Sequence, residues 1–229
     1  MKKGAKSMAT KIEAVAINDA ALSVRGLTAD LPKGMARAHA VENVSFELER
    51  GQILRIIGES RSGKSVTANT IMGLLPKIIP VTSGAINLGG TTIVGAPEKK
   101  SRQLRGRVVS MIFQDPLSAL TPLMTVGEQV TEVMAAHGVG TKASRRDRAL
   151  ELLCPTRNSC ISSTPSGFRV VSASDIQRRK DMSVMFIPHD FGVVAEIADS
   201  VVVMDKGRIV EQGGADQVLK SPAALTRSA

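Results

Sequence analysis

The chain has 229 residues, a formal net charge of +9, 43% hydrophobic residues and only 2% aromatic residues. This length suits one medium-sized domain, and a core without Trp or Tyr must be aliphatic, which is typical of a parallel sheet covered by helices. The basic residues are dispersed and no apolar run is long enough to span a bilayer, which argues against specific nucleic-acid binding and against a transmembrane protein.

Strand and helix signals alternate along the chain, as expected of an α/β fold. Residues 1–19 are basic, and acidic residues among them interrupt any signal-peptide pattern, so we expect a loose extension. Apolar runs predict strands at 21–24, 41–48, 52–57, 84–88, 91–94, 108–113, 184–187, 201–204 and 208–211. Helical spacing predicts helices at 66–75, 98–105, 126–136, 142–153, 191–198 and 215–220, the first of them ended by Pro76.

Between residues 154 and 180 this periodicity is lost. The segment is rich in Ser, Thr, Pro and Arg, and it cannot bury enough apolar surface to offset an ordering entropy of ~1–2 kcal/mol per residue. We therefore expect an irregular, exposed segment that is the first site of limited proteolysis. The strand at 184–187 should still pair in the sheet, because its four apolar side chains require burial on both faces.

The most informative motif is residues 58–65, which read Gly-Glu-Ser-Arg-Ser-Gly-Lys-Ser and fit the phosphate-binding pattern G-x-x-x-x-G-K-[ST]. The glycines allow a tight turn whose N–H groups surround a phosphate, Lys64 reaches the β- and γ-phosphates, and the Ser65 hydroxyl binds Mg²⁺. A chance Gly/Ser-rich surface turn is the alternative, but a predicted strand before the motif and a helix after it favour nucleotide binding. The candidate nucleotide-binding residues are Gly58, Glu59, Ser60, Arg61, Ser62, Gly63, Lys64, Ser65 and Val66.

Several blocks in a fixed order resemble the ATP-binding subunits of ABC transporters, in the branch that imports dipeptides, oligopeptides and nickel. Besides the phosphate loop, they are Val108–Pro116 (VVSMIFQDP) with the following LSALTP, Met182–Asp190 (MSVMFIPHD), Phe191–Ala198 (FGVVAEIA) and Val201–Glu211 (VVVMDKGRIVE). The resemblance covers about residues 20–153 and 181–222.

The resemblance implies a P-loop NTPase domain of the ABC type at 20–222, with an antiparallel β subdomain, a reduced helical subdomain and a tail at 223–229. It implies ATP and Mg²⁺ as ligands, with Ser65 and Gln114 at the metal. Gln114 would approach the attacking water and couple the site to a membrane subunit, and His189 would contact the γ-phosphate. Without the flanking blocks, Gln114 would be interpreted as a polar strand end and His189 as a helix-capping surface residue.

The same resemblance implies the partners and the location. The expected partners are integral membrane permease subunits, a sister ATPase subunit and, indirectly, a solute-binding protein, with no specific nucleic acid. The expected location is cytoplasmic, peripheral on the inner face of the cell membrane.

The chain departs from the family pattern where hydrolysis is performed. The signature LSGGQ is missing, and Ser166-Gly167 is the nearest match. The strand that ends in Asp-Glu is also missing: Asp205 ends an apolar run but is followed by Lys206, and Asp175 ends only a weak imitation. We expect that a stretch between residues 153 and 182 was deleted or frame-shifted, leaving the central sheet incomplete beside the phosphate-loop strand.

Two smaller departures concern nucleotide binding. Arg61 replaces a glycine usual in the loop, and a positive φ there would cost about 1 kcal/mol. No aromatic residue precedes Val41 to stack on adenine, so Met35 or His39 would have to serve.

Two functions follow from these patterns. The first is an ATP-binding subunit of a peptide-type importer whose hydrolysis is impaired. The second is a non-catalytic nucleotide-binding or interaction protein derived from that family, and ATP turnover separates the two.

Overall fold

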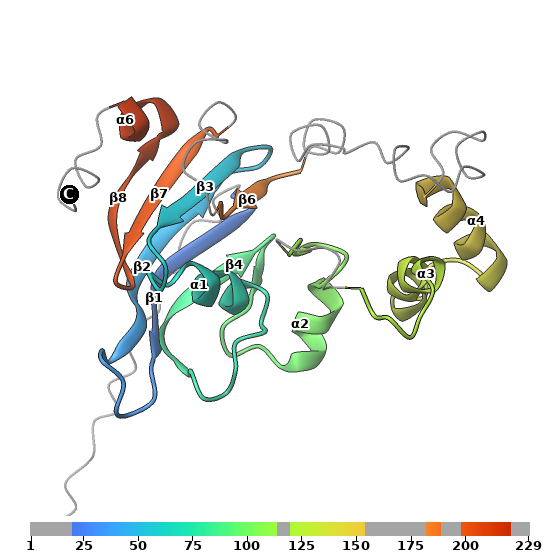
Figure 1. Cartoon of the computed structure of the whole chain (residues 1–229), viewed down its shortest axis with the longest axis horizontal. Coiled ribbons are helices and arrows are strands. Elements are labelled where there is room, and N and C mark those ends of the chain that lie inside the picture. Colours follow the sequence, from blue (N-terminus) through green and yellow to red (C-terminus); the bar gives the residue numbers. More distant parts are fainter. Residues whose placement is uncertain (1–19, 114–119, 154–181, 189–197, 221–229) are drawn as a thin grey trace, which may run out of the picture.

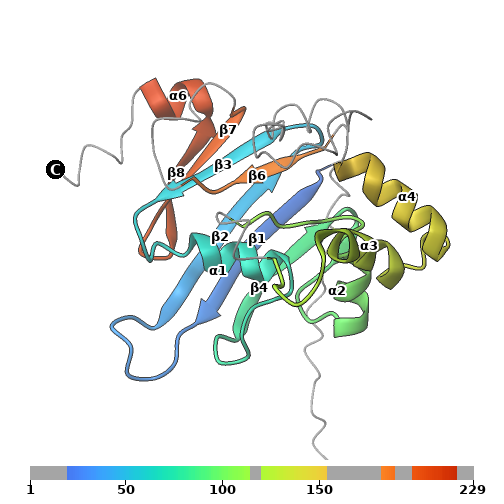
Figure 2. The same cartoon turned by 45° about the vertical axis from the view of Figure 1, so that its right-hand side comes forward.

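Two four-stranded sheets face each other in the computed structural model, which describes residues 20–113, 120–153, 182–188 and 198–220. The first sheet is antiparallel with the strand order β2-β1-β4-β5, and the second has the order β6-β3-β7-β8. Figure 2 shows β1 and β2 passing behind β3 and β6. The first sheet consists of β1 (Leu22–Asp30), β2 (His39–Leu48), β4 (Val81–Leu88) and β5 (Thr91–Thr92).

The second sheet is built around β3 (Ile53–Gly58), the strand that leads into the phosphate loop. It pairs in parallel with β6 (Val184–Phe186) on one side and with β7 (Ser200–Asp205) on the other, and β8 (Arg208–Gly214) joins β7 as an antiparallel edge. Five of the six β3 residues are buried, as expected of a central parallel strand. One of them, Arg55, is completely buried, and this burial lowers the pKa of its guanidinium.

The main hydrophobic core lies between the two sheets. Alternate residues of β1 and β2 point into it, because side chains on a strand alternate between its faces. They meet Leu54 and Ile56 of β3 and Val202 and Met204 of β7, all nearly inaccessible to solvent. A second, smaller cluster covers the opposite face of the second sheet and consists of Ile57, Val201, Val203, Ala215 and Val218.

Helix α1 (Lys64–Ile71) follows the phosphate loop and packs against the main core, in which Ile71 is buried. The helix ends earlier than the pattern predicted. Gly73 adopts a left-handed conformation with φ 63°, the Gly73 N–H donates to Thr70 O, and the Leu74 N–H donates to Asn69 O. This is a Schellman motif, which satisfies the last carbonyls of the helix, so Gly73 rather than Pro76 ends the helix.

The remaining helices are α2 (Glu98–Leu104), α3 (Val126–Ala136), α4 (Lys142–Leu153) and α6 (Ala215–Lys220). Helices α3 and α4 pack on each other and lie apart from the two sheets (Figure 1). Thr125 begins α3 with a capping box, in which its hydroxyl accepts from the Glu128 N–H while the Glu128 carboxylate accepts from the Thr125 N–H. None of the helices in the described ranges has the length and apolar character needed to cross a lipid bilayer.

The structure corrects two of the strand predictions. Residues 108–113 form turns and irregular backbone with one isolated bridge, and the side chains of Val108, Ile112 and Phe113 are 55%, 83% and 56% exposed. An apolar segment becomes a strand only with a ladder partner, and no described strand flanks this one. The strand ending in Asp-Glu, which the sequence lacks, was expected to leave a gap beside β3. In the structure β3 is paired on both sides. Within the described part of the sheet, the open edge is on β6 instead.

Most other predicted elements are confirmed with ends shifted by a few residues, but the strand predicted at 21–24 continues to Asp30. The strand at 184–187 does pair with β3, although its side chains are only half-buried. The predicted helix at 191–198 and the irregular segment at 154–180 lie outside the described residues, except for Ala198.

The capping box of α3 can be tested by replacing its hydroxyl. Thr125→Ala should destabilise α3 by about 1 kcal/mol, because one helix N–H loses its acceptor. Faster amide hydrogen exchange across 126–136 would report the loss. Thr131→Ala lies in the middle of the same helix, where Ala is the better helix former, and should not accelerate exchange. Equal acceleration in both variants would contradict the capping role.

Candidate nucleotide-binding site

The phosphate loop joins the end of β3 at Gly58 to the start of α1 at Lys64. The backbone passes so close to β7 that a Cβ on Gly58 would lie 2.1 Å from the carbonyl oxygen of Met204. Gly63 is the N-cap residue of α1 and is left-handed, with φ 104°. The loop therefore closes tightly onto the N-terminus of a helix, where main-chain N–H groups and the helix dipole favour an anion.

Two main-chain carbonyl groups of the phosphate loop hold the ammonium group of Lys64. Its Nζ donates to Gly58 O at 2.6 Å and to Glu59 O at 2.8 Å, and lies 3.3 Å from the Ser62 hydroxyl. Burial lowers the pKa of the Lys64 ammonium, and a bound phosphate would act in the opposite direction by stabilising the positive charge. The contact with the phosphates that the sequence assigned to Lys64 stays a prediction.

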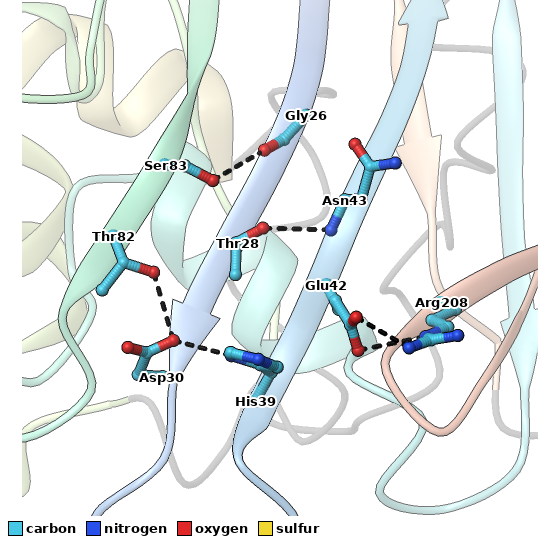
Figure 3. A network of polar contacts seen from close by, with 9 residues as sticks. All are labelled: Gly26, Thr28, Asp30, His39, Glu42, Asn43, Thr82, Ser83 and Arg208. Carbon is cyan, nitrogen blue, oxygen red and sulfur yellow. Dashed lines mark hydrogen bonds and ion pairs between the residues drawn. The ribbon is translucent and has the colours of Figure 1, made fainter.

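The β7–β8 hairpin supports the loop from one side. The Gly207 N–H donates to Ser62 O at 3.0 Å, and Gly207 O accepts from the Glu42 N–H of β2 at 2.8 Å. Figure 3 shows the Glu42 carboxylate receiving two hydrogen bonds from Arg208, at 2.7 and 3.0 Å. The hairpin tip is thus fastened both to the loop and to β2 of the other sheet.

The segment between β1 and β2 supports the loop from another side. Arg37 Nη2 donates to the carbonyl oxygen of Arg61 at 2.6 Å. At the base of this segment, Asp30 accepts from His39 Nδ1 at 2.7 Å and from the Thr82 hydroxyl at 3.1 Å, so that three neighbouring strands are linked (Figure 3). His39, one of the two residues considered for stacking on adenine, is therefore held by a carboxylate.

Arg61 has the backbone conformation that the sequence identified as costly. Its φ is 67°, in the left-handed region, where a residue with a Cβ costs about 1 kcal/mol or more relative to Gly. The conformation is stabilised by the hydrogen bond from Arg37 to its carbonyl, while its own side chain is exposed.

The structure describes only some of the other predicted site residues. Ser65 is exposed on the first turn of α1, whereas Val66 is half-buried and packs against the core. Gln114 and His189 lie outside the described residues, so their expected places at the site stay predictions. Arg37 and the Lys206–Gly207 turn were not predicted at the site, because they reach the loop only through tertiary contacts.

The described residues fit a bound polyphosphate better than a directly bound metal. The loop offers N–H groups, the Lys64 ammonium and the exposed Ser65 hydroxyl, which could contribute one Mg²⁺ ligand. No group of three or more His, Cys, Asp or Glu side chains suited to holding a metal occurs in the part of the chain that the structure describes.

The strand–loop–helix unit in a parallel sheet defines a P-loop nucleotide-binding protein. The chain matches the ABC transporter family over residues 41–182. It is 34% identical to the oligopeptide transport ATP-binding protein OppD of Bacillus subtilis, covering 88% of this chain and 68% of that protein. The chain belongs to the ABC transporter family.

Two further relatives support this assignment. The dipeptide transport ATP-binding protein DppD of Lactococcus lactis is 34% identical, with 88% of this chain and 70% of the relative covered. The peptidoglycan transport ATP-binding protein YejF of Agrobacterium fabrum is 36% identical over 90% of this chain, but only 46% of its own length is covered.

Solved structures share the fold at lower sequence identity. The ATP-binding cassette MJ0796, in a dimer bound to ADP and Pi, has a TM-score of 0.63 at 17% identity, with 85% of this chain and 98% of that chain covered. An ATP-binding subunit of an ABC transporter has a TM-score of 0.61 at 22% identity, with 90% and 96% covered.

The close approach of the hairpin to β2 can be tested with two glycines in matched turns. Gly207 and Gly90 have similar φ values of 90° and 83°, but a Cβ on Gly207 would lie 2.7 Å from Ala40 O, whereas one on Gly90 meets nothing within 4 Å. Gly90→Ala should lower the free energy of unfolding by about 1–2 kcal/mol through backbone strain alone. Gly207→Ala should lose a further ~1–3 kcal/mol from overpacking. Equal losses of unfolding free energy, measured by urea denaturation, would show that the hairpin does not pack closely against β2.

Proposed function

We propose that residues 58–66 bind Mg-ATP and that the chain is the ATP-binding subunit of an ABC importer for peptides or similar small solutes. The observation that carries this proposal is the phosphate loop itself, held at the N-terminus of α1 with the Lys64 ammonium fixed over it. The main-chain N–H groups would bind the phosphates, Lys64 would neutralise their charge, and Ser65 would offer its hydroxyl to Mg²⁺.

The transported solute and the partners follow from the relatives rather than from the site. The relatives at 34% identity are named as oligopeptide and dipeptide transport ATP-binding proteins. We therefore infer permease subunits and a sister ATPase subunit as direct partners, a solute-binding protein as an indirect one, and a peripheral position on the cytoplasmic face of the membrane. Two residues complete this assignment. Gln114 is proposed to sense Mg²⁺ and couple the site to the permease, and His189 is proposed to contact the γ-phosphate. The division into an extension at 1–19, a domain at 20–222 and a tail at 223–229 also stays a prediction.

We infer further that hydrolysis is impaired by an internal loss between residues 153 and 182. The alignment with the Bacillus subtilis relative spans 247 positions, but 88% of 229 residues is only about 202, so about 45 aligned positions have no residue here. The exposed apolar side chains of residues 108–113 support the same inference, because a strand-like segment without a ladder partner suggests that the partner was lost. A missing catalytic carboxylate removes the group that orients the attacking water.

A non-catalytic nucleotide-binding protein is the second candidate function. It is favoured by the same observation, since the phosphate loop is complete while no signature motif or Asp-Glu pair follows it. The two functions differ in whether ATP is turned over in the assembled transporter.

Nucleotide binding is tested by removing the loop lysine. Lys64→Ala should abolish or strongly weaken the binding of Mg-ATP measured by titration calorimetry, because the phosphates lose their cation. Lys77→Ala, which removes an exposed lysine away from the loop, should leave the affinity unchanged. Unchanged affinity in Lys64→Ala would refute the assignment of the loop.

Hydrolysis is tested by phosphate release. The chain should show no turnover above that of Lys64→Ala, which serves as the background for contaminating ATPases. A Lys64-dependent rate within the usual enzyme range of ~1–1000 s⁻¹ would contradict the impairment and point to Asp175 as a substitute acid. Replacing residues 154–181 with the corresponding segment of the Bacillus subtilis relative should restore turnover if the loss lies there.

A further inference from the structure

The outer turn of the phosphate loop carries a guanidinium that the family pattern does not require. Arg61 is exposed, left-handed at φ 67°, and lies two residues before the N-cap of α1. Its carbonyl oxygen accepts a hydrogen bond from Arg37 at 2.6 Å. A left-handed backbone is strained for a residue with a Cβ relative to Gly, and the exposed side chain of Arg61 is the part of the residue that can contact a ligand.

The charges around the loop favour an anion beyond what the backbone alone would bind. Within the described residues, no ion pair involves Arg37 or Arg61, whereas other arginines at the surface do form such pairs, for example Arg208 with Glu42. The hairpin that contacts the loop adds the exposed Lys206. The opposing carboxylates on these segments are Glu59 and Asp205, so cations exceed acids at the rim of the loop.

The chemistry of the guanidinium matches the terminal phosphate. The inner phosphates of a nucleotide are surrounded by loop N–H groups, whereas the terminal one carries the most charge and is the most accessible. A guanidinium presents a planar fork of donors that binds two phosphate oxygens at once, which a single ammonium such as that of Lys64 cannot do.

We propose that Arg61 is a specificity-determining residue that binds the terminal phosphate of a nucleoside triphosphate, and that Arg37 is a positioning residue that holds it there. The proposal rests on the proposed ATP binding at residues 58–66. Arg61 makes the loop prefer ATP over ADP, and thereby retains ATP without assistance from the missing signature motif.

The test compares ATP and ADP affinities in the full chain by titration calorimetry with Mg²⁺. Arg61→Gln should weaken ATP binding about tenfold, as expected for a lost charge-assisted hydrogen bond, and change ADP binding less than about twofold. Arg61→Lys should lose part of the preference for ATP over ADP, because the positive charge remains but the planar fork of donors does not. Arg37→Gln should reduce the ATP-to-ADP preference in the same direction, through the position of Arg61.

Arg146→Gln is the matched control, since Arg146 is exposed on α4, far along the chain from the loop. It should leave both affinities unchanged. Thermal unfolding without nucleotide is measured in parallel: a shifted midpoint with an unchanged ATP-to-ADP ratio would show that Arg61 is only structural and would overturn the proposal. If the wild-type chain binds neither nucleotide, the proposed function itself fails; if it binds both and Arg61→Gln keeps the ratio, only this inference fails.

Discussion

The close packing of the phosphate loop against β7, the β7–β8 hairpin and the segment between β1 and β2 is the constraint on which the rest of the structure depends. At Gly58 the chain approaches β7 too closely for any side chain, and at Gly207 the β7–β8 hairpin touches both the loop and β2. These contacts hold the backbone of the loop in one position. In the proposed nucleotide site, a loop held in this way would gain affinity because little reorganisation is left to be done on binding.

The same contacts explain how binding can be separated from hydrolysis. Every element that positions the loop lies either in β1–β3 and α1 or in β7 and β8, and these segments are present with ordinary pairing on both sides of β3. Apart from Arg61 within the loop, the structural irregularities fall elsewhere, at the β6 edge and in residues 108–113, where the side chains of Val108, Ile112 and Phe113 are exposed. The contacts that position the loop therefore do not depend on residues 108–113 or on the β6 edge.

Sequence patterns predicted most elements correctly because each has a local cause. The alternation along β2, the apolar run of β3 and the glycine-rich turn before α1 are all set by neighbouring residues. The prediction for 108–113 was wrong because a strand also needs a partner, which local pattern cannot supply. The end of α1 was misplaced because Pro76 is a conspicuous stop signal, whereas the Schellman motif at Gly73 ends the helix first.

By itself, the sequence determined the α/β class, the phosphate-loop motif with Lys64 and Ser65, and the cost that a positive φ would have at Arg61, because each depends on residues adjacent in the chain. Only the tertiary structure decided that Arg37 supports Arg61 and that the Lys206–Gly207 turn supports Ser62. Those partners are separated from the loop by more than twenty residues in one case and by more than a hundred in the other. Their contacts exist because the two sheets pack face to face, and the packing of distant segments leaves no periodic signal in the sequence.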